Sequence, residues 1–126
     1  MKIVGVGFDL VDIAELEKRL SSPAFRRRVF TDAEIEIAEE RRKSLECLAG
    51  KFAVKEAVMK CLGAGIQQGL WFCQIEVLNE SSGAPFLILH KTTKELSDQR
   101  GITQWQISIS HTQHSAGAVV LAVIEK

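Results

Sequence analysis

The pattern of apolar and polar positions predicts one buried strand at the start of the 126-residue chain, followed by helices. Residues 3–11 are nearly all apolar, which is typical of a strand covered on both faces. Asp12 and Glu15 have the spacing of a helix start, and that helix should end before Pro23, because proline cannot continue it. A capping box at the start of residues 31–43 predicts a second helix.

Strand patterns dominate the second half of the chain. Four segments alternate or run apolar as strands do: 71–77, 86–89, 105–110 and 116–124. Thr92 and Glu95 have capping-box spacing for a short helix that stops at Gly101. Helices grouped early and antiparallel hairpins grouped late predict an α+β fold, an antiparallel sheet packed with helices.

The amino-acid composition limits the class of protein but does not identify a function. Hydrophobic residues make up 46% and charged residues 25%, which fits one globular domain spanning 1–126 and excludes a disordered chain. Sixteen basic residues balance sixteen acidic ones, which argues against general nucleic-acid binding. No apolar run approaches the roughly 18 residues of a membrane helix. Three cysteines without a CxxC motif predict small buried side chains and a cytoplasmic location.

Asp9 is the first candidate for chemistry, because it interrupts the apolar run at residues 3–13. A charge there is costly unless it is paired, hydrogen-bonded or bound to a metal. The alternative is that Asp9 only helps to cap the helix that follows. The preceding Gly5-x-Gly7 is not a dinucleotide fingerprint, since Leu10 stands where the third glycine belongs.

Glu56 is the second candidate and lies on a predicted helix over residues 44–62, with Gly63 as its C-cap. Spacings of three and four place Glu56 on the apolar stripe of that helix, between Phe52 and Met59. A half-buried carboxylate suits a magnesium ligand. Alternatively, Glu56 forms a simple ion pair with Lys60, one turn further along.

Two short segments could contact phosphate. Lys60 leads into the glycine-rich turn of Gly63 and Gly65, where a backbone can approach a phosphate closely, although Gly63 could be no more than a helix cap. His111 and Thr112 follow a predicted strand and could donate hydrogen bonds, or could be plain loop residues. The sequence argues against a zinc site at His111, because no third ligand stands near His111 and His114.

Residues 18–28 carry five basic side chains and no acidic one: Lys18, Arg19, Arg26, Arg27 and Arg28. Such a run is usually a solvated face, but it could also dock an acidic protein. Use of the run to bind RNA is disfavoured by the zero net charge and by the lack of an aromatic RNA motif. Residues 39–43 look like mixed helix surface.

Four stretches, taken together, resemble the small phosphopantetheinyl transferases of the holo-(acyl carrier protein) synthase family. They are GVGFDLV at 5–11, RVFT with Thr31 and Glu34 at 28–34, FAVKEA with the lysine and glycines that follow at 52–66, and ISISHT at 107–112. The resemblance covers the whole chain and implies the 4′-phosphopantetheinyl transferase-like fold. It also implies transfer of 4′-phosphopantetheine from coenzyme A to a serine of apo-acyl carrier protein, which releases adenosine 3′,5′-bisphosphate.

The resemblance assigns roles to individual residues. It implies that Asp9 and Glu56 hold Mg²⁺, and that Lys60, His111 and Thr112 contact coenzyme A phosphates. Gly63, Gly65 and Pro85 match positions that shape the nucleotide pocket, and the basic run matches the surface that docks the carrier protein. Family members are homotrimers with interfacial sites. Glu56, directly or through a bound water, is the candidate base for the serine proton.

Two positions depart from the family pattern. Glu15 stands where an arginine usually meets the carrier protein, and Lys18 or Arg19 could compensate. Lys51 replaces a frequent arginine before FAVKEA and keeps the charge but not the bidentate fork. A non-catalytic module of the same fold that binds coenzyme A or carrier protein is the alternative function.

Overall fold

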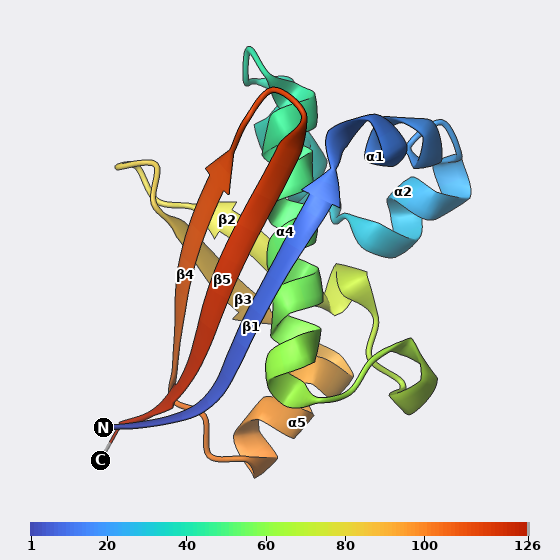
Figure 1. Ribbon diagram of the computed structural model, residues 1–126. Helices are drawn as coiled ribbons and strands as arrows, with labels where there is room; N and C mark the ends of the chain where they lie inside the picture. The colour runs from blue at the N-terminus through green and yellow to red at the C-terminus, as the bar shows by residue number, and fades with distance from the viewer. Residues whose placement is uncertain (126) are drawn as a thin grey trace.

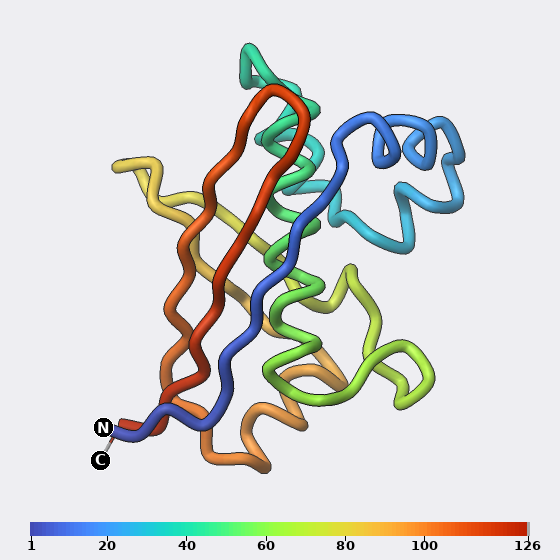
Figure 2. Tube along the Cα trace, viewed as in Figure 1, coloured from blue at the N-terminus to red at the C-terminus, as the bar shows by residue number. Residues whose placement is uncertain are grey.

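The protein, described here over residues 1–125 by a computed structural model, is built around a three-stranded antiparallel sheet and one long helix (Figure 1). The sheet has the order β1-β5-β4, formed by β1 (Lys2–Asp12), β5 (Ser115–Ile124) and β4 (Gln104–His111). Helix α4 (Ser44–Leu62) packs along one face of this sheet. Figure 2 shows β1 and β5 side by side along their length, with both chain ends at the same end of the sheet. The α+β prediction is confirmed.

The other elements surround α4. They are α1 (Ile13–Arg19), α2 (Pro23–Val29), α3 (Asp32–Glu39), the 3₁₀ turns η1 (Ile66–Gln68) and η2 (Phe72–Gln74), the hairpin β2 (Ile75–Asn79) and β3 (Pro85–Leu89), and α5 (Lys91–Gln99). Asp12 caps α1 and Thr31 forms the predicted capping box with Glu34. No helix within residues 1–125 has the length and apolar character needed to span a membrane.

Helix α1 ends before Pro23, as predicted, but α2 was not predicted and begins at Pro23, because proline fits the first turn of a helix. Three other predictions are wrong. Helix α3 ends at Glu39 rather than near residue 43. The alternation at 71–77 is a strand only from residue 75, since η2 occupies its first half. Thr92 does not cap α5, which starts at Lys91 with no side-chain cap.

Two glycines allow β1 to lie directly against α4. A Cβ atom on Gly7 would stand 1.9 Å from the carbonyl oxygen of Ala57, and one on Gly5 would stand 2.9 Å from that of Cys61. Both contacts are with helix backbone, which cannot move aside as a flexible side chain can. The close approach brings the end of β1, with Asp9, next to the part of α4 that carries Glu56 and Lys60.

We expect Gly7→Ala to lower the free energy of unfolding by about 2 kcal/mol or more, because the new methyl group must push β1 away from α4. Urea unfolding of the variant measures this loss. Gly65→Ala is the matched control, since the nearest atom to its added Cβ lies 3.9 Å away. Equal stability of the Gly7 variant and the wild type would contradict the proposed close contact.

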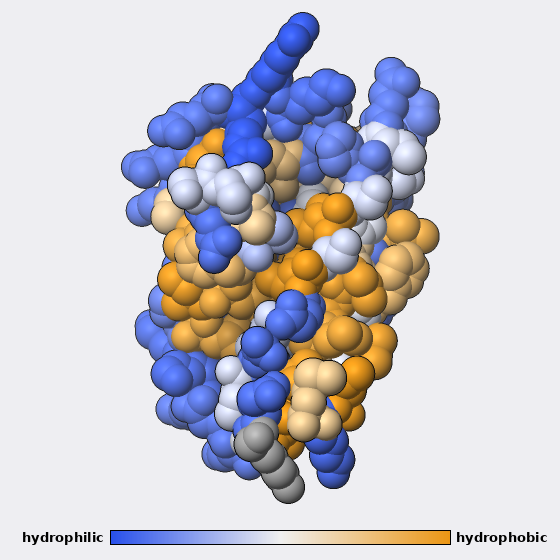
Figure 3. Space-filling model, turned by 90° about the vertical axis from the view of Figure 1, so that its left-hand side faces the viewer, coloured by the Kyte–Doolittle hydropathy of each residue, from blue (hydrophilic) through white to orange (hydrophobic). Residues whose placement is uncertain are grey.

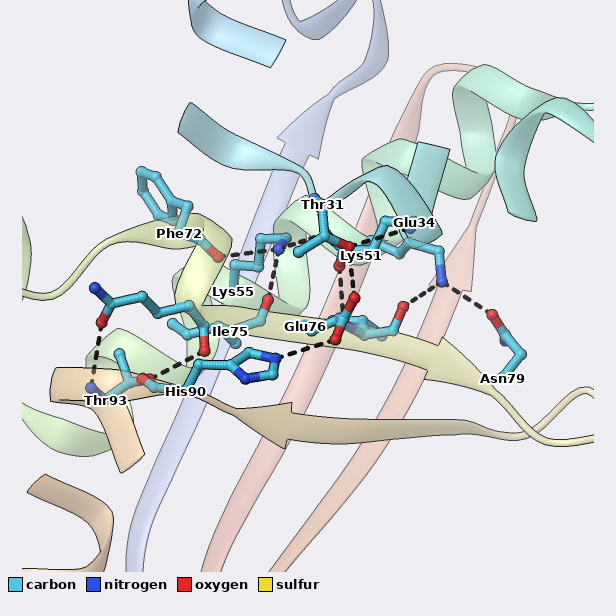
Figure 4. A network of polar contacts seen from close by, with 12 residues as sticks. Thr31, Glu34, Lys51, Lys55, Phe72, Ile75, Glu76, Asn79, His90 and Thr93 are labelled. Carbon is cyan, nitrogen blue, oxygen red and sulfur yellow. Dashed lines mark hydrogen bonds and ion pairs between the residues drawn. The ribbon is translucent and has the colours of Figure 1, made fainter. Parts of the chain in front are cut away.

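A buried ion pair fixes α4 against the β2–β3 hairpin (Figure 4). Lys55 Nζ lies 2.8 Å from Glu34 Oε1, with both side chains fully buried, and also donates to the carbonyls of Phe72 and Ile75. Glu34 in turn accepts from the backbone N–H of Val77 at 2.8 Å. Every hydrogen of the Lys55 ammonium therefore has a partner, and the rotation of α4 about its axis is set by this network.

The outer face of the three-stranded sheet is not covered by the chain itself, so the prediction that residues 3–11 form a strand covered on both faces is wrong for the single chain. Several apolar side chains of β1 and β5 are exposed there: Val4, Val6, Phe8, Leu10 and Val119. Figure 3 shows a continuous apolar area on the side of the molecule that carries this sheet. A surface of this kind marks an interaction site more often than a free protein surface.

Candidate functional site

Asp9 and Lys60 meet where β1 crosses α4. Lys60 Nζ lies 2.9 Å from Asp9 Oδ1 and donates to the carbonyl oxygen of Phe8 at 3.0 Å. The hydrogen bond to Asp9 raises the pKa of Lys60. The alternative of a helix ion pair between Glu56 and Lys60 is wrong, since Lys60 pairs with Asp9 across the strand–helix contact.

Glu56 points into a pocket beside this pair. The pocket has a volume of about 520 Å³, and its lining includes Asp9, Glu15, Arg19, Phe52 and Glu56. Burial raises the pKa of Glu56, and the negative charge of Asp9 raises it further, although Lys60 and Arg19 oppose the shift. Four carboxylates line the pocket, those of Asp9, Asp12, Glu15 and Glu56, and the repulsion between Asp9 and Glu56 acts in a partly dry environment.

The carboxylates of Asp9 and Glu56 fit a hard divalent cation as part of its ligand set. Carboxylate oxygens are the donors that Mg²⁺ prefers, and a cation would relieve the repulsion that raises the pKa of Glu56. Residues 1–125 hold no group of three or more His, Cys, Asp or Glu side chains placed to bind a metal. With Asp9 and Glu56 as its protein ligands, a bound cation would take its remaining ligands from substrate oxygens and water.

The end of α4 turns sharply after Lys60. Gly63 has a left-handed backbone (φ 63°) and is the C-cap, as one of the two interpretations of this residue predicted. Gly65 is extended and its N–H donates to the side chain of Gln68 at 2.7 Å. The glycine-rich segment is thus a tight, exposed turn that begins three residues after Lys60.

A second pocket lies at the other edge of the sheet. It has a volume of about 390 Å³, and its wall combines Pro85 and His111 with the basic residues Arg41, Arg42, Lys43 and Lys51. The view of residues 39–43 as mixed helix surface is wrong, because α3 ends at Glu39 and residues 40–43 lie outside a helix. The signal that could have identified Arg41, Arg42 and Lys43 as pocket residues is their position as a basic run directly before α4.

His111 and Thr112 form the tip of the β4–β5 hairpin. Thr112 Oγ1 accepts the backbone N–H of His114 and Ser115, at 3.2 and 3.1 Å, which shapes the turn and leaves the His111 ring exposed. Asp9 lies on β1 and His111 on β4, the two outer strands of the sheet, with β5 between them. One chain therefore brings Asp9, Glu56 and Lys60 together, but not with His111 and Pro85.

The predicted basic run is divided between two helices. Arg26, Arg27 and Arg28 are exposed on α2, and Lys18 is exposed on α1. Arg19 differs from them in making a cation–π contact: its guanidinium lies 4.4 Å from the centre of the Phe25 ring. It is held at the rim of the Glu56 pocket by this cation–π contact.

All three cysteines are unpaired and half-buried, so the prediction of small buried side chains is only partly correct. Burial raises the pKa of Cys61 to about 11, and its Sγ donates to the carbonyl of Val120. Cys61 is therefore an inert packing residue and not a nucleophile.

Comparisons with known proteins agree on one family. The family model described as the 4′-phosphopantetheinyl transferase superfamily matches residues 5–121. The chain is 40% identical over 123 residues to a holo-[acyl-carrier-protein] synthase of Vibrio atlanticus, covering 96% of this chain and 98% of the relative. It is 43% identical over 119 residues to that of Syntrophus aciditrophicus, covering 93% of each.

Solved structures give the same result. The fold matches the holo-[acyl-carrier-protein] synthase of Neisseria meningitidis with a TM-score of 0.86 at 27% identity, over 97% of this chain and 99% of that one. It matches a Chronobacterium ammoniagenes ACPS–CoA complex with a TM-score of 0.85 at 30% identity, over 100% of both chains.

Proposed function

The chain belongs to the 4′-phosphopantetheinyl transferase superfamily, and we propose that it transfers 4′-phosphopantetheine from coenzyme A to a serine of apo-acyl carrier protein. The observation that carries the proposal is the meeting of Asp9 and Glu56 in one pocket, with Lys60 paired to Asp9 beside it. Two carboxylates and an ammonium group suit a reaction at a diphosphate, in which negative charge develops on phosphoryl oxygens.

In the proposed reaction the serine oxygen forms a bond to the pantetheine-bearing phosphorus of coenzyme A. The bond from that phosphorus to the bridging oxygen breaks, and adenosine 3′,5′-bisphosphate leaves with the electron pair. Mg²⁺, when bound to Asp9 and Glu56, would supply positive charge to the diphosphate. Lys60 donates two hydrogens to Asp9 and Phe8, so its third can reach a phosphoryl oxygen.

Glu56 is the proposed acceptor of the serine proton. It is half-buried beside Asp9, where a hydroxyl group entering the 520 Å³ pocket would meet it. Gly63 and Gly65 would let the backbone approach the diphosphate closely.

The nucleotide end of coenzyme A is proposed to bind in the second pocket. Arg41, Arg42, Lys43 and Lys51 supply cationic groups there, against one acidic residue, Glu46. This excess of positive charge suits a ligand that carries several negatively charged phosphate groups. Pro85 offers an apolar wall for a base, while His111 and Thr112 stand at the edge of the pocket region.

The two pockets suggest that the working enzyme is a homotrimer with sites between subunits. Metal-binding and nucleotide-binding residues lie at opposite edges of one sheet, and the exposed face between them is apolar. A neighbouring copy covering that face would bring its His111 edge to the Asp9 edge of the first. Light scattering should give three times the mass of 14.0 kDa, and a monomer would contradict this assembly.

The basic residues of α2 are proposed to dock the acidic carrier protein. We expect Arg27→Glu to raise the KM for the carrier protein roughly tenfold and to leave the KM for coenzyme A unchanged, because exposed rim charges act mainly on encounter. Steady-state kinetics at low and high salt measure both constants. Lys94→Glu, on the distant α5, is the control, and equal effects of the two substitutions would contradict docking on α2.

The experiment that tests the function is the intact mass of an apo-acyl carrier protein after incubation with the protein, coenzyme A and Mg²⁺. A gain of one phosphopantetheine that EDTA prevents is the expected result. Coenzyme A binding without any gain, tried with several carriers, would favour a non-catalytic binding module. Three unpaired cysteines support a reducing cytoplasm as the place where the protein works.

A further inference from the structure

Helix α5 touches the glycine-rich segment after α4 at both ends of that segment. Arg100, directly after α5, donates a guanidinium hydrogen bond to the carbonyl of Leu62, the last residue of α4. The hydroxyl of Thr92, in the first turn of α5, lies 2.6 Å from the carbonyl oxygen of Gly69 and 2.5 Å from Gln74 Oε1, and its one hydrogen can be donated to either acceptor. Figure 1 shows α5 crossing beside the lower end of α4, where the segment begins.

Between these two contacts the segment is held by its own short-range backbone hydrogen bonds: the N–H groups of Gln68 and Leu70 donate to the carbonyl of Gly65, and that of Gly69 donates to the carbonyl of Ile66. Gly63 and Gly69 both have left-handed backbones, with φ of 63° and 85°, and residues 66–68 are exposed. Glycines lose more conformational freedom on ordering than other residues, so a segment with three of them is costly to fix. Inside it, Gly65 N–H and the Gln68 side chain make one short hydrogen bond of 2.7 Å.

The carbonyl that Arg100 contacts belongs to the unpaired end of α4. Met59 and Lys60 have their carbonyls satisfied by the N–H groups of Ala64 and Gly63. The carbonyl of Leu62 comes after them and receives the guanidinium. A cation at this point also interacts favourably with the negative end of the helix dipole. Arg100 therefore fixes the point at which the chain leaves α4, two residues after Lys60.

We propose that α5 braces residues 63–69 from both ends, and that Arg100 and Thr92 are positioning residues that hold this segment ready for the diphosphate of coenzyme A. The inference rests on the proposed function, in which Gly63 and Gly65 lie against that diphosphate. Neither side chain touches the reacting atoms. Each acts through a backbone carbonyl. Together they restrict the conformations of residues 63–69 before coenzyme A binds, so that binding loses less conformational entropy.

The test compares Arg100→Met and Thr92→Val with the wild type in the intact protein. Amide hydrogen exchange should become faster at residues 63–69 and stay unchanged in β1 and β5. The KM for coenzyme A should rise roughly threefold to tenfold in each variant, as expected for one lost hydrogen bond, with little change in kcat. Arg100→Lys and Thr92→Ser keep a donor and should restore both readouts.

Lys94→Met is the matched control, because Lys94 lies on the same helix and pairs only with Asp98 at an exposed surface. It should change neither exchange nor KM. An unchanged KM and unchanged exchange at 63–69 in the Arg100 and Thr92 variants would overturn the brace. Faster exchange throughout the protein would also overturn it, since that is global destabilisation. If the wild type itself does not turn over coenzyme A, the proposed function fails, while hydrogen exchange still tests the brace.

Discussion

Glu56→Gln is expected to reduce phosphopantetheine transfer by at least about 100-fold and to make the metal-free protein more stable at pH 7. The loss of activity follows because glutamine can neither accept the serine proton nor provide a charged ligand to Mg²⁺. The gain in stability follows because burial and the charge of Asp9 raise the pKa of Glu56 in the folded state. The ionised Glu56 side chain therefore lowers the free energy of unfolding, although the proposed reaction requires it.

The pH dependence separates this explanation from a general effect of substitution. A raised pKa means that the folded state holds the Glu56 proton more tightly than the unfolded state does. Wild-type stability should thus contain a contribution that is present below the ordinary value of 4.5 and is lost as the pH rises through the raised value. Urea unfolding without metal, measured between pH 4 and 8, should show this decline in the wild type and not in Glu56→Gln.

Glu39→Gln, at an exposed position at the end of α3, is the control for both measurements. It should keep wild-type activity and the wild-type pH profile. Retained activity in Glu56→Gln would contradict both the metal and the base assignment. A Glu56→Gln variant that is inactive and also less stable at pH 7 would show that Glu56 supports the fold instead.

Sequence motifs that have a single structural interpretation, such as helix caps, predicted the fold well. The capping box at Thr31 and the C-cap at Gly63 are satisfied within a few residues of chain, and both are present. Pro23 was ambiguous, because proline ends one helix and equally well starts another, and the chain uses it to start α2. Thr92 has capping-box spacing, but its hydroxyl instead faces tertiary acceptors, the carbonyl of Gly69 and the side chain of Gln74.

The candidate site was predictable only in part. Asp9 and Glu56 stood out because each places a charge in an apolar pattern, and the structure brings both into one pocket. The partner of Lys60 could not be predicted from helix spacing, since the contact depends on glycines that let β1 approach α4. Nothing in the local sequence marks Arg100, whose role depends on where α5 packs.

Lys55→Met is expected to lower the free energy of unfolding by about 3–5 kcal/mol, the largest effect on stability that we predict for one substitution. The substitution leaves the Glu34 carboxylate buried without its cation, and it removes the donor to the carbonyls of Phe72 and Ile75. Urea or thermal unfolding at pH 7 measures the loss. Lys94→Met, which breaks an exposed pair, should cost less than about 1 kcal/mol.

The double variant Lys55→Met with Glu34→Gln distinguishes a buried unpaired charge from a loss of packing. Removing the second charge should recover part of the stability, because glutamine keeps an oxygen for the N–H groups of Thr31 or Val77 without a buried negative charge. A double variant that is less stable than Lys55→Met alone would contradict this explanation. Burial lowers the pKa of Lys55 while the charge of Glu34 raises it, so the two residues must be removed together for the penalty to disappear.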